Sequence, residues 1–305
     1  MTGIDKRNHP SLESGMTGYP DMARLNRRTL LAAILALPAF GHSGPAVAAP
    51  AGQDDQLILA DGRAVPLRIW RPTGRPKSLI AFSHGANSRP DKYDRLFAPL
   101  AQAGHLVVAP LHADSPDHPG GGKIAREDGI PMRLSDMRGV LAKYQNGLPG
   151  IAAGHSYGAL IAQMLGGADG QAPAPTISAI LAWSPPGPFP PMITAETWKS
   201  VARPMLVVTG TADSLPVMAP TWEVHRLSHD ISPAPSVLFV GDRVDHYFGN
   251  IICRPERTEP PQTAQFEDAV AVSLAFTALA LHHKQKFASL ARTRMPGESW
   301  VEVKR

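Results

Sequence analysis

The sequence is very poor in cysteine: its 305 residues contain a single one, Cys253. One cysteine cannot form a disulfide within the chain, so the fold must be stabilised by its core. We expect Cys253 to be a buried core thiol. No cysteine follows the N-terminal region closely enough to be acylated, so no lipid anchor is expected there.

Charge and long apolar runs are also scarce. Charged residues make up 18% of the chain, and its lysines and arginines are scattered rather than clustered. This distribution argues against a nucleic-acid-binding surface. The apolar run at residues 30–40 is about half the ~20 residues that span a membrane, and Pro38 interrupts it. We therefore expect no stable membrane anchor. The chain contains no internal repeat, and its 43% hydrophobic content suffices for a large core.

The N-terminal region has the features of an export signal. Arg27 and Arg28 directly precede the short apolar run, and Ala46-Val47-Ala48 offers a cleavage site. This pattern predicts a signal of the twin-arginine type at residues 1–48, recognised by export machinery, and a periplasmic or secreted protein. Translation could also begin at Met16 or Met22. The signal holds five basic and three acidic residues, a net charge of +2. Its removal therefore leaves the mature chain with +2 of the formal charge of +4.

The mature chain, residues 49–305, is predicted to be one α/β domain. Apolar strand patterns alternate with helical ones, which is typical of a mainly parallel sheet covered by helices on both faces. We expect an antiparallel hairpin around Asp61-Gly62 to open it. The predicted strands are 56–60, 65–70, 78–83, 105–110, 151–153, 176–183, 204–209 and 236–240, and the predicted helices are 91–103, 132–144, 160–165, 220–227 and 265–283.

The clearest motif is Gly154-His155-Ser156-Tyr157-Gly158, between an apolar strand and a helical pattern. Gly-x-Ser-x-Gly in this setting predicts a nucleophile elbow, a sharp turn that holds a serine in strained backbone geometry. Side chains at the two glycine positions would collide in so tight a turn. We therefore identify Ser156 as the candidate nucleophile.

Two further residues complete a candidate catalytic triad. A serine needs a base to remove its proton, and the base needs a third group to orient it. Asp213 follows the strand at 204–209, and His246 follows the last predicted strand. The chain order Ser156, Asp213, His246 is that of the α/β-hydrolases. Asp245 is a less favoured acid because it adjoins the histidine.

The other histidines considered as the base are excluded by their predicted positions on helices, away from the strand ends. They are His225, His229, His282 and His283.

The oxyanion hole requires two backbone N–H donors. Tyr157 follows the nucleophile and supplies one. The turn Ser83-His84-Gly85-Ala86, after the strand at 78–83, supplies the other from Ala86.

The walls of the substrate pocket are assigned to two long segments, the loop at 112–131 and the proline-rich stretch at 184–198. His84, Trp183 and Phe189 are the proposed pocket side chains, although such aromatic residues can equally seal the core.

A second set of polar residues suggests a metal site only superficially. His112, Asp114, Asp117 and His118 lack regular ligand spacing and a cysteine, so we expect a solvated loop and no metal or other cofactor.

Taken together, these segments resemble α/β-hydrolases of the dienelactone hydrolase type. The similarity is strongest to the branch that contains platelet-activating-factor acetylhydrolases, chlorophyllases and cutinase-like polyester hydrolases. It covers roughly residues 56–283 and includes residues 104–110 and 133–141 besides the motifs above. Dienelactone hydrolase itself has a cysteine where this chain has Ser156. The absence of a cysteine pair also departs from many secreted polyester hydrolases.

The resemblance implies hydrolysis of a small-molecule carboxylic ester through an acyl-enzyme. Three alternatives remain open. The same triad could serve acyl transfer, perhydrolysis or amide cleavage. The fold could also have become a binding protein without catalysis. A membrane-surface lipase would need a large apolar lid, and neither long segment has that pattern.

Overall fold

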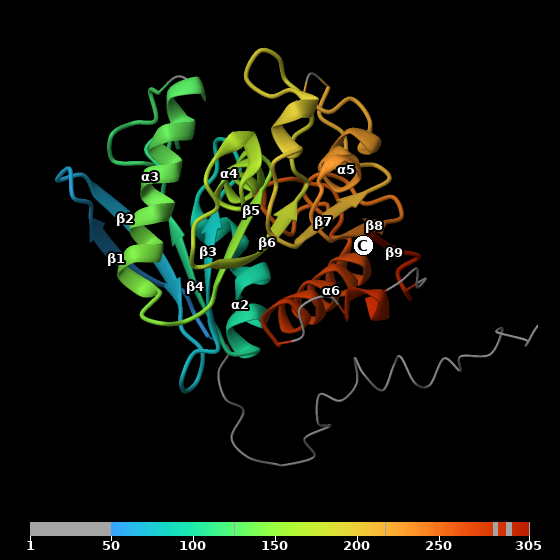
Figure 1. The fold of residues 1–305 in the computed structure, drawn as a ribbon, viewed down its shortest axis with the longest axis horizontal. Coiled ribbons are helices and arrows are strands. Elements are labelled where there is room, and N and C mark those ends of the chain that lie inside the picture. The colour runs from blue at the N-terminus through green and yellow to red at the C-terminus, as the bar shows by residue number, and fades with distance from the viewer. Residues whose placement is uncertain (1–49, 125, 217, 283–285, 291–294, 305) are drawn as a thin grey trace, which may run out of the picture. The chain divides into compact units, whose positions relative to one another are not determined.

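The computed structural model describes residues 50–124, 126–216, 218–282, 286–290 and 295–304. The predicted export signal lies outside these residues. The described chain forms a nine-stranded sheet in the order β1-β2-β4-β3-β5-β6-β7-β8-β9 (Figure 1). The strands are β1 (Gln53–Ile58), β2 (Ala64–Trp70), β3 (Ser78–Ser83), β4 (His105–Pro110), β5 (Gly150–His155), β6 (Ile177–Trp183), β7 (Met205–Gly210), β8 (Ser236–Gly241) and β9 (Trp300–Lys304).

The centre of the sheet is parallel and its edges are antiparallel. Strands β3 to β8 pair in parallel, whereas β2 pairs antiparallel with both β1 and β4, and β9 pairs antiparallel with β8. Strands β3, β4, β5, β7 and β8 are buried along their whole length, which explains their continuous apolar sequences. The predicted α/β class, with its N-terminal hairpin, is confirmed.

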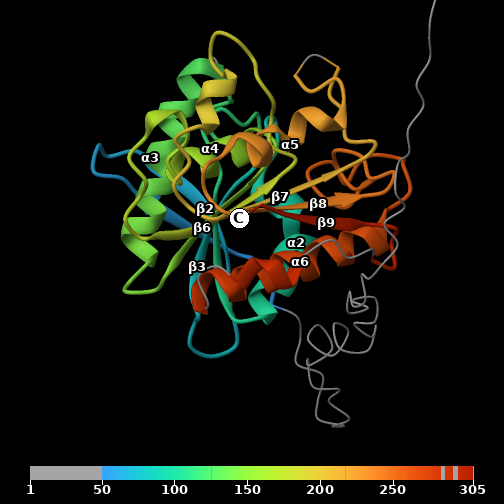
Figure 2. The same ribbon diagram turned by 45° about the vertical axis from the view of Figure 1, so that its right-hand side comes forward.

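Helices cover both faces of this sheet. On one face α3 (Arg126–Tyr144), α4 (Tyr157–Leu165) and α5 (Trp222–Ile231) pack over a core that includes Leu134, Leu160 and Leu238. On the other face, α2 (Asp94–Gln102) and α6 (Thr263–His282) lie beside each other, as the turned view shows (Figure 2). Four short 3-10 helices complete the described elements: η1 (Pro90–Tyr93), η2 (Ala168–Gly170), η3 (Ala195–Trp198) and η4 (Lys286–Leu290).

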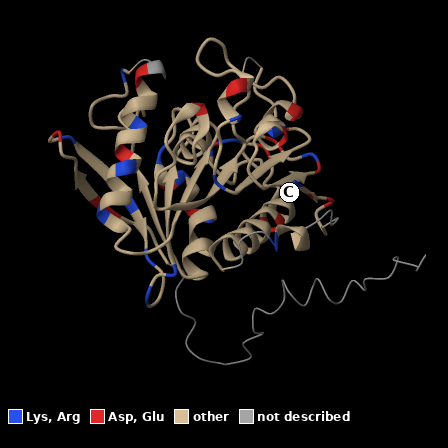
Figure 3. Cartoon of the chain, in the orientation of Figure 1, with Lys and Arg blue, Asp and Glu red and all other residues tan. Residues whose placement is uncertain are grey.

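Helix α6 is long and apolar enough to cross a membrane by length and composition alone. Its buried residues include Phe266, Val270 and Phe276, which join the core on that face of the sheet. This packing explains the apolar composition of α6 as that of a core helix. Acidic and basic residues are interspersed along the described chain (Figure 3).

Two parts of the fold differ from the sequence-based prediction. Residues 112–131 were predicted to be a loop, but α3 begins at Arg126 and includes Pro131 in its first turns. Pro131 is the sixth residue of α3, so the helix lacks one backbone hydrogen bond in its second turn. No strand was predicted after residue 283, but β9 pairs with β8 and buries Val301.

The strand order determines where a site can form. After β3 the chain passes to β4 on one side, and β5 then pairs on the other side of β3. Such a reversal opens a crevice beyond the C-terminal ends of the two diverging strands. Ser83 ends β3 and His155 ends β5, so the turns that follow both strands meet at this crevice.

Candidate functional site

Ser156 occupies a strained turn between β5 and α4. Its backbone angles, φ 54° and ψ −123°, lie in a region that residues with a side chain rarely adopt. Both glycines of the motif are required. A Cβ on Gly154 would lie 2.2 Å from the Gly158 carbonyl oxygen, and one on Gly158 would lie 1.9 Å from the Ser83 carbonyl oxygen. The elbow therefore packs directly against the end of β3.

Asp213 and His246 come together at the ends of β7 and β8. The His246 Nδ1 lies 2.7 Å from Asp213 Oδ1, and both side chains are buried. Burial raises the pKa of Asp213, but the two neighbouring histidines outweigh it and hold this pKa well below its ordinary value. The carboxylate is therefore ionised, and His246 Nδ1 donates to it. The less favoured acid, Asp245, instead accepts from the backbone N–H groups of Tyr247 and Gly249.

His155, which precedes the nucleophile, connects the loops of the site. Its Nε2 donates to the carbonyl oxygen of His246 at 2.9 Å, and its Nδ1 accepts from the Tyr93 hydroxyl at 3.0 Å. The same hydroxyl accepts from the N–H of Gly85 at 2.9 Å. Burial lowers the pKa of His155 to about 4, which keeps the ring neutral and preserves these donor and acceptor roles.

Two hydroxyl groups that the sequence analysis missed complete the surroundings of Asp213. Its Oδ2 accepts from Ser184 Oγ at 2.6 Å and from Thr209 Oγ1 at 2.9 Å. Thr209 lies near the end of β7, and Ser184 directly follows β6. Their position at strand ends was the signal that could have identified them.

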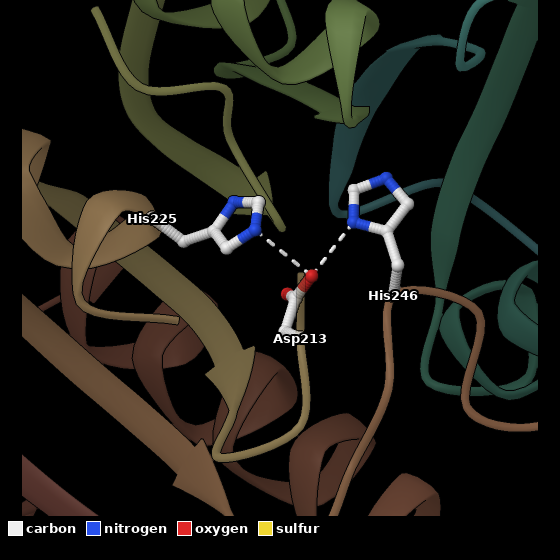
Figure 4. A group of neighbouring side chains, drawn as sticks. All are labelled: Asp213, His225 and His246. Carbon is white, nitrogen blue, oxygen red and sulfur yellow. Dashed lines mark hydrogen bonds and ion pairs between the residues drawn. The ribbon is translucent and has the colours of Figure 1, made fainter. Parts of the chain in front are cut away.

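The prediction that His225 lies away from the strand ends was wrong. Helix α5 points this side chain at the site, where its Nε2 lies 2.9 Å from Asp213 Oδ1 (Figure 4). His225 and His246 thus approach one carboxylate oxygen from two different elements. No sequence pattern indicates this contact, because it depends on how α5 packs on the sheet. His229, on the same helix, instead bonds Ser236 Oγ.

His84 was predicted to line the substrate pocket. The structure does not bear this out, because His84 is fully buried. Its Nδ1 donates to the Gly85 carbonyl at 2.8 Å, and its Nε2 accepts from the His112 N–H at 3.1 Å. The Gly85 carbonyl and the Ala86 N–H belong to one trans peptide unit, so they point in opposite directions. By holding the carbonyl, His84 fixes the direction of the Ala86 N–H, the candidate oxyanion donor.

Two arginines hold the same turn through its other carbonyl groups. Arg133, fully buried on α3, donates to the His84 carbonyl at 2.6 Å and contacts the Asp114 carboxylate at 2.9 Å. Its guanidinium also lies 4.5 Å from the centre of the Tyr157 ring. Arg254 donates to the Ala86 carbonyl at 2.9 Å. The turn is therefore anchored on both sides of Gly85.

The two candidate oxyanion residues line the same cavity, which has a volume of about 240 Å³. It is lined by Ala86 and Tyr157 and by Asn87, Asp114, Gly122 and Ile124. The loop after β4 thus contributes to the wall of this cavity, and its role in a substrate pocket stays a prediction. Two larger hollows, of about 450 and 620 Å³, lie along β1 and contain none of the candidate site residues.

The other two proposed pocket side chains have different surroundings. Trp183 is buried and packs against Phe248 and Phe266 in the core, so its prediction as a pocket residue was wrong. Phe189 is half-buried and bridges Ile193 within the proline-rich segment. Cys253 is buried, as expected.

The donor atoms of Asp213, His225 and His246 lie within 4.8 Å of one another, close enough to be considered for a metal. However, the carboxylate oxygen is only 2.7 and 2.9 Å from the two ring nitrogens. Ligands about 2.0–2.2 Å from a tetrahedral zinc are more than 3 Å apart. These are direct contacts between the side chains, and they are too short for ligands of one common metal. In the loop after β4, His112 and Asp114 are likewise engaged by Asp136 and Arg133.

Comparison with known proteins gives partial sequence matches and broad structural ones. No family model matches the chain. Human monoglyceride lipase is 38% identical over 116 residues, which cover 35% of each protein. The rat monoglyceride lipase is 33% identical over 107 residues, 34% of this chain and 35% of the lipase. The match thus spans about a third of the length of these curated relatives.

Solved structures resemble most of the chain. A putative dienelactone hydrolase from Klebsiella pneumoniae superposes with a TM-score of 0.58 at 18% identity, over 75% of this chain and 99% of its own. Propionate-bound esterase 2 from Thermogutta terrifontis has a TM-score of 0.54 at 16% identity, over 76% and 95%. A puromycin-hydrolyzing peptidase from Mycobacterium tuberculosis also has 0.54 at 15% identity, over 79% and 41%. The chain therefore has the α/β-hydrolase fold that its motifs predicted.

Proposed function

We propose that the protein is a serine hydrolase that cleaves a carboxylic ester, with Ser156 as nucleophile, His246 as base and Asp213 as the orienting acid. The observation that carries the proposal is the 2.7 Å contact between His246 Nδ1 and Asp213 Oδ1, and the strained backbone of Ser156 supports it. The similarity to esterases and to monoglyceride lipase supports the same reaction class.

The proton positions define the chemistry. Because His246 Nδ1 donates to Asp213, its other nitrogen, Nε2, is the one with a free electron pair. That nitrogen removes the hydroxyl proton of Ser156 as the serine attacks the ester carbonyl. The Ala86 and Tyr157 N–H groups stabilise the oxyanion of the tetrahedral intermediate. Its collapse breaks the ester bond, and His246 gives its proton to the leaving alcohol.

The second half of the reaction uses the same groups. Water attacks the acyl-Ser156 ester while His246 takes a proton from that water, and collapse of the second intermediate returns the proton to the serine. Burial lowers the pKa of His246, with Asp213 opposing this effect, so the pKa stays below its ordinary 6.5. The imidazole is therefore the neutral base at neutral pH.

The test is hydrolysis of p-nitrophenyl esters from acetyl to long acyl by residues 49–305, beside the variant Ser156→Ala. We expect at least one ester to be hydrolysed by the wild-type chain and none by the variant. Thermal unfolding of both proteins provides the control, because loss of one hydroxyl at the turn should leave stability nearly unchanged. Substantial hydrolysis by Ser156→Ala would refute the assignment of the nucleophile.

A second set of reactions separates the alternatives. Thermogutta esterase 2 has been captured phosphorylated by paraoxon, so paraoxon is a suitable probe for the serine here. We expect one phosphoryl adduct on Ser156 by mass spectrometry. Matched anilides and an added alcohol acceptor test amide cleavage and acyl transfer, and hydrogen peroxide tests perhydrolysis. Faster turnover of an anilide than of its ester would favour amide cleavage over the proposed reaction.

We also propose that residues 1–48 direct export, on the basis of Arg27-Arg28, the apolar run and Ala46-Val47-Ala48. Expression in a bacterium with a twin-arginine pathway should yield periplasmic protein whose N-terminus is residue 49. Replacement of both arginines by lysine should retain the protein in the cytoplasm, whereas unchanged export of that variant would contradict the proposal.

A further inference from the structure

The carboxylate of Asp213 is shared by two buried histidines. Oδ1 lies 2.7 Å from His246 Nδ1 and 2.9 Å from His225 Nε2, while Oδ2 is occupied by the hydroxyls of Ser184 and Thr209. Neither histidine ring is appreciably exposed: His225 is 0% and His246 2% accessible. The proposed reaction uses only His246, which leaves the second imidazole without a role.

The contacts of His225 determine its protonation. Nδ1 lies 2.7 Å from the carbonyl oxygen of Pro185, which can only accept, so Nδ1 carries a proton. Nε2 faces the ionised carboxylate, which also only accepts. A neutral ring would leave an unprotonated nitrogen only 2.9 Å from a negative oxygen. A proton on Nε2 instead gives an ion pair, although this N–H has no aligned hydrogen-bond acceptor. Both nitrogens are therefore protonated.

We propose that His225 is a charged positioning residue: its buried imidazolium shares Asp213 with His246 and so lowers the affinity of His246 for a proton. This inference rests on the proposed function, in which His246 is the base. An ordinary triad aspartate stabilises one imidazolium, the one that forms during catalysis. Here a positive charge is already present, with ring centres 5.5 Å apart. Protonation of His246 therefore costs more, and the base remains neutral at a lower pH.

The groups that face His246 come from several elements. Asp213 approaches from the end of β7 and His225 from α5. His155, at the end of β5, packs against it at a tilted angle with ring centres 4.8 Å apart, and the Tyr247 ring lies at 5.0 Å. Burial lowers the pKa of His225, but the Asp213 carboxylate outweighs it and the net shift is upward. This direction agrees with the charge deduced from the contacts.

The first test measures the protonation state of His225 directly, without an activity assay. In ¹⁵N-histidine-labelled protein at pH 6.5, where an unshifted imidazole is half protonated, we expect both ring nitrogens of His225 to show mainly imidazolium shifts, assigned by their loss in His225→Gln. We also expect the pKa of His246, followed in the same spectra, to rise by about two pH units in that variant. A unit charge at this distance produces a shift of this order at an effective dielectric constant of about 20. A predominantly neutral His225 in the wild-type protein at pH 6.5 would overturn the proposal.

The second test measures the pH–rate profile of ester hydrolysis on its acid limb, where the rate falls as His246 is protonated. His225→Gln should move the midpoint of the limb to higher pH by the same amount, and His225→Asn, which can still donate to Pro185, provides a second variant. His229→Gln is the matched control on α5, since His229 contacts Ser236 rather than Asp213. A merely structural role would lower the rate at all pH values without moving the limb. An unshifted limb and an unshifted His246 pKa in both variants would overturn the proposal. Failure of the proposed function would appear separately, as absence of hydrolysis by the wild-type protein with the spectra unaffected.

Discussion

Arg133 offers the sharpest test of how the candidate oxyanion turn is held. Its side chain is fully buried, donates to the His84 carbonyl at 2.6 Å and pairs with Asp114 at 2.9 Å. The replacement Arg133→Met fills a similar space but removes every donor. The carbonyl oxygen of a buried peptide then loses its partner, and the Asp114 carboxylate, which is only 10% exposed, loses its counter-charge.

The expected loss of stability can be estimated from these contacts. Removing one partner of a buried ion pair costs roughly 3–5 kcal/mol. Asp114 reaches solvent at its edge, so we expect the lower end, about 3 kcal/mol. In a domain of this size each kcal/mol lowers the unfolding midpoint by about 2–4 °C. Arg133→Met should therefore unfold about 6–12 °C below the wild-type protein in a calorimetric or fluorescence melt.

Activity should decrease further, because the same carbonyl positions the peptide that presents the Ala86 N–H. Removal of one oxyanion donor costs about 100- to 1,000-fold in kcat, so a displaced donor should cost about 10- to 100-fold. The matched control is Arg138→Met on the same helix, where an exposed arginine donates to Gln171 Oε1 at 3.3 Å. We expect that variant to behave like the wild-type protein. An Arg133→Met protein with an unchanged melting temperature and full kcat would refute the argument.

Three further predictions concern the base, the elbow and the last strand. The rate of ester hydrolysis should fall on acidification with a midpoint below pH 6.5, because burial lowers the pKa of His246 and only its neutral form is the base; a pH–rate profile with a midpoint above 7 would contradict this. Gly158→Ala should be insoluble or inactive, since its Cβ would lie 1.9 Å from the Ser83 carbonyl oxygen, and normal soluble activity would disprove the packing of the elbow. Val301→Asp should lower the melting temperature markedly because it places an unpaired carboxylate opposite Phe239, whereas the less buried Val303→Asp should cost less.

The parts of the fold that the sequence predicted well are those determined by local pattern. The buried central strands have continuous apolar runs, and the elbow pairs two obligatory glycines with a strand and a helix. Strand β9 was missed although residues 301–304 alternate apolar and polar side chains and the turn signal Pro296-Gly297 precedes them. Its pairing with β8 depends on tertiary contacts between residues that are far apart in the sequence, which a local pattern does not reveal. The start of α3 was placed late because Pro131 was taken as a helix boundary rather than a residue of the first turns.

For the candidate site, the sequence predicted strand-end residues better than residues that depend on packing. Asp213 and His246 follow β7 and β8, and the structure places them in contact. His225 lies on the buried side of α5, where helical spacing does not indicate that it faces a carboxylate. Trp183 and His84 were interpreted as pocket residues because they lie at strand ends. Yet side chains at a strand end alternate between faces, so position along the chain alone does not determine which of them is accessible.

The hydrogen bonds around His155 show why these loops must be considered as one unit. The ring of His155 accepts a hydrogen bond from the Tyr93 hydroxyl and donates one to the His246 carbonyl. The Tyr93 hydroxyl also accepts a hydrogen bond from the Gly85 N–H. The turn that carries Ala86 and the loop that carries the base are thus joined through the residue before Ser156. A displacement of either loop would break a buried hydrogen bond, which costs about 1–3 kcal/mol for each group left unpaired. Preorganisation of this kind places donors and base at fixed positions before substrate binds, and it explains why polar side chains are buried behind a serine that is itself near the surface.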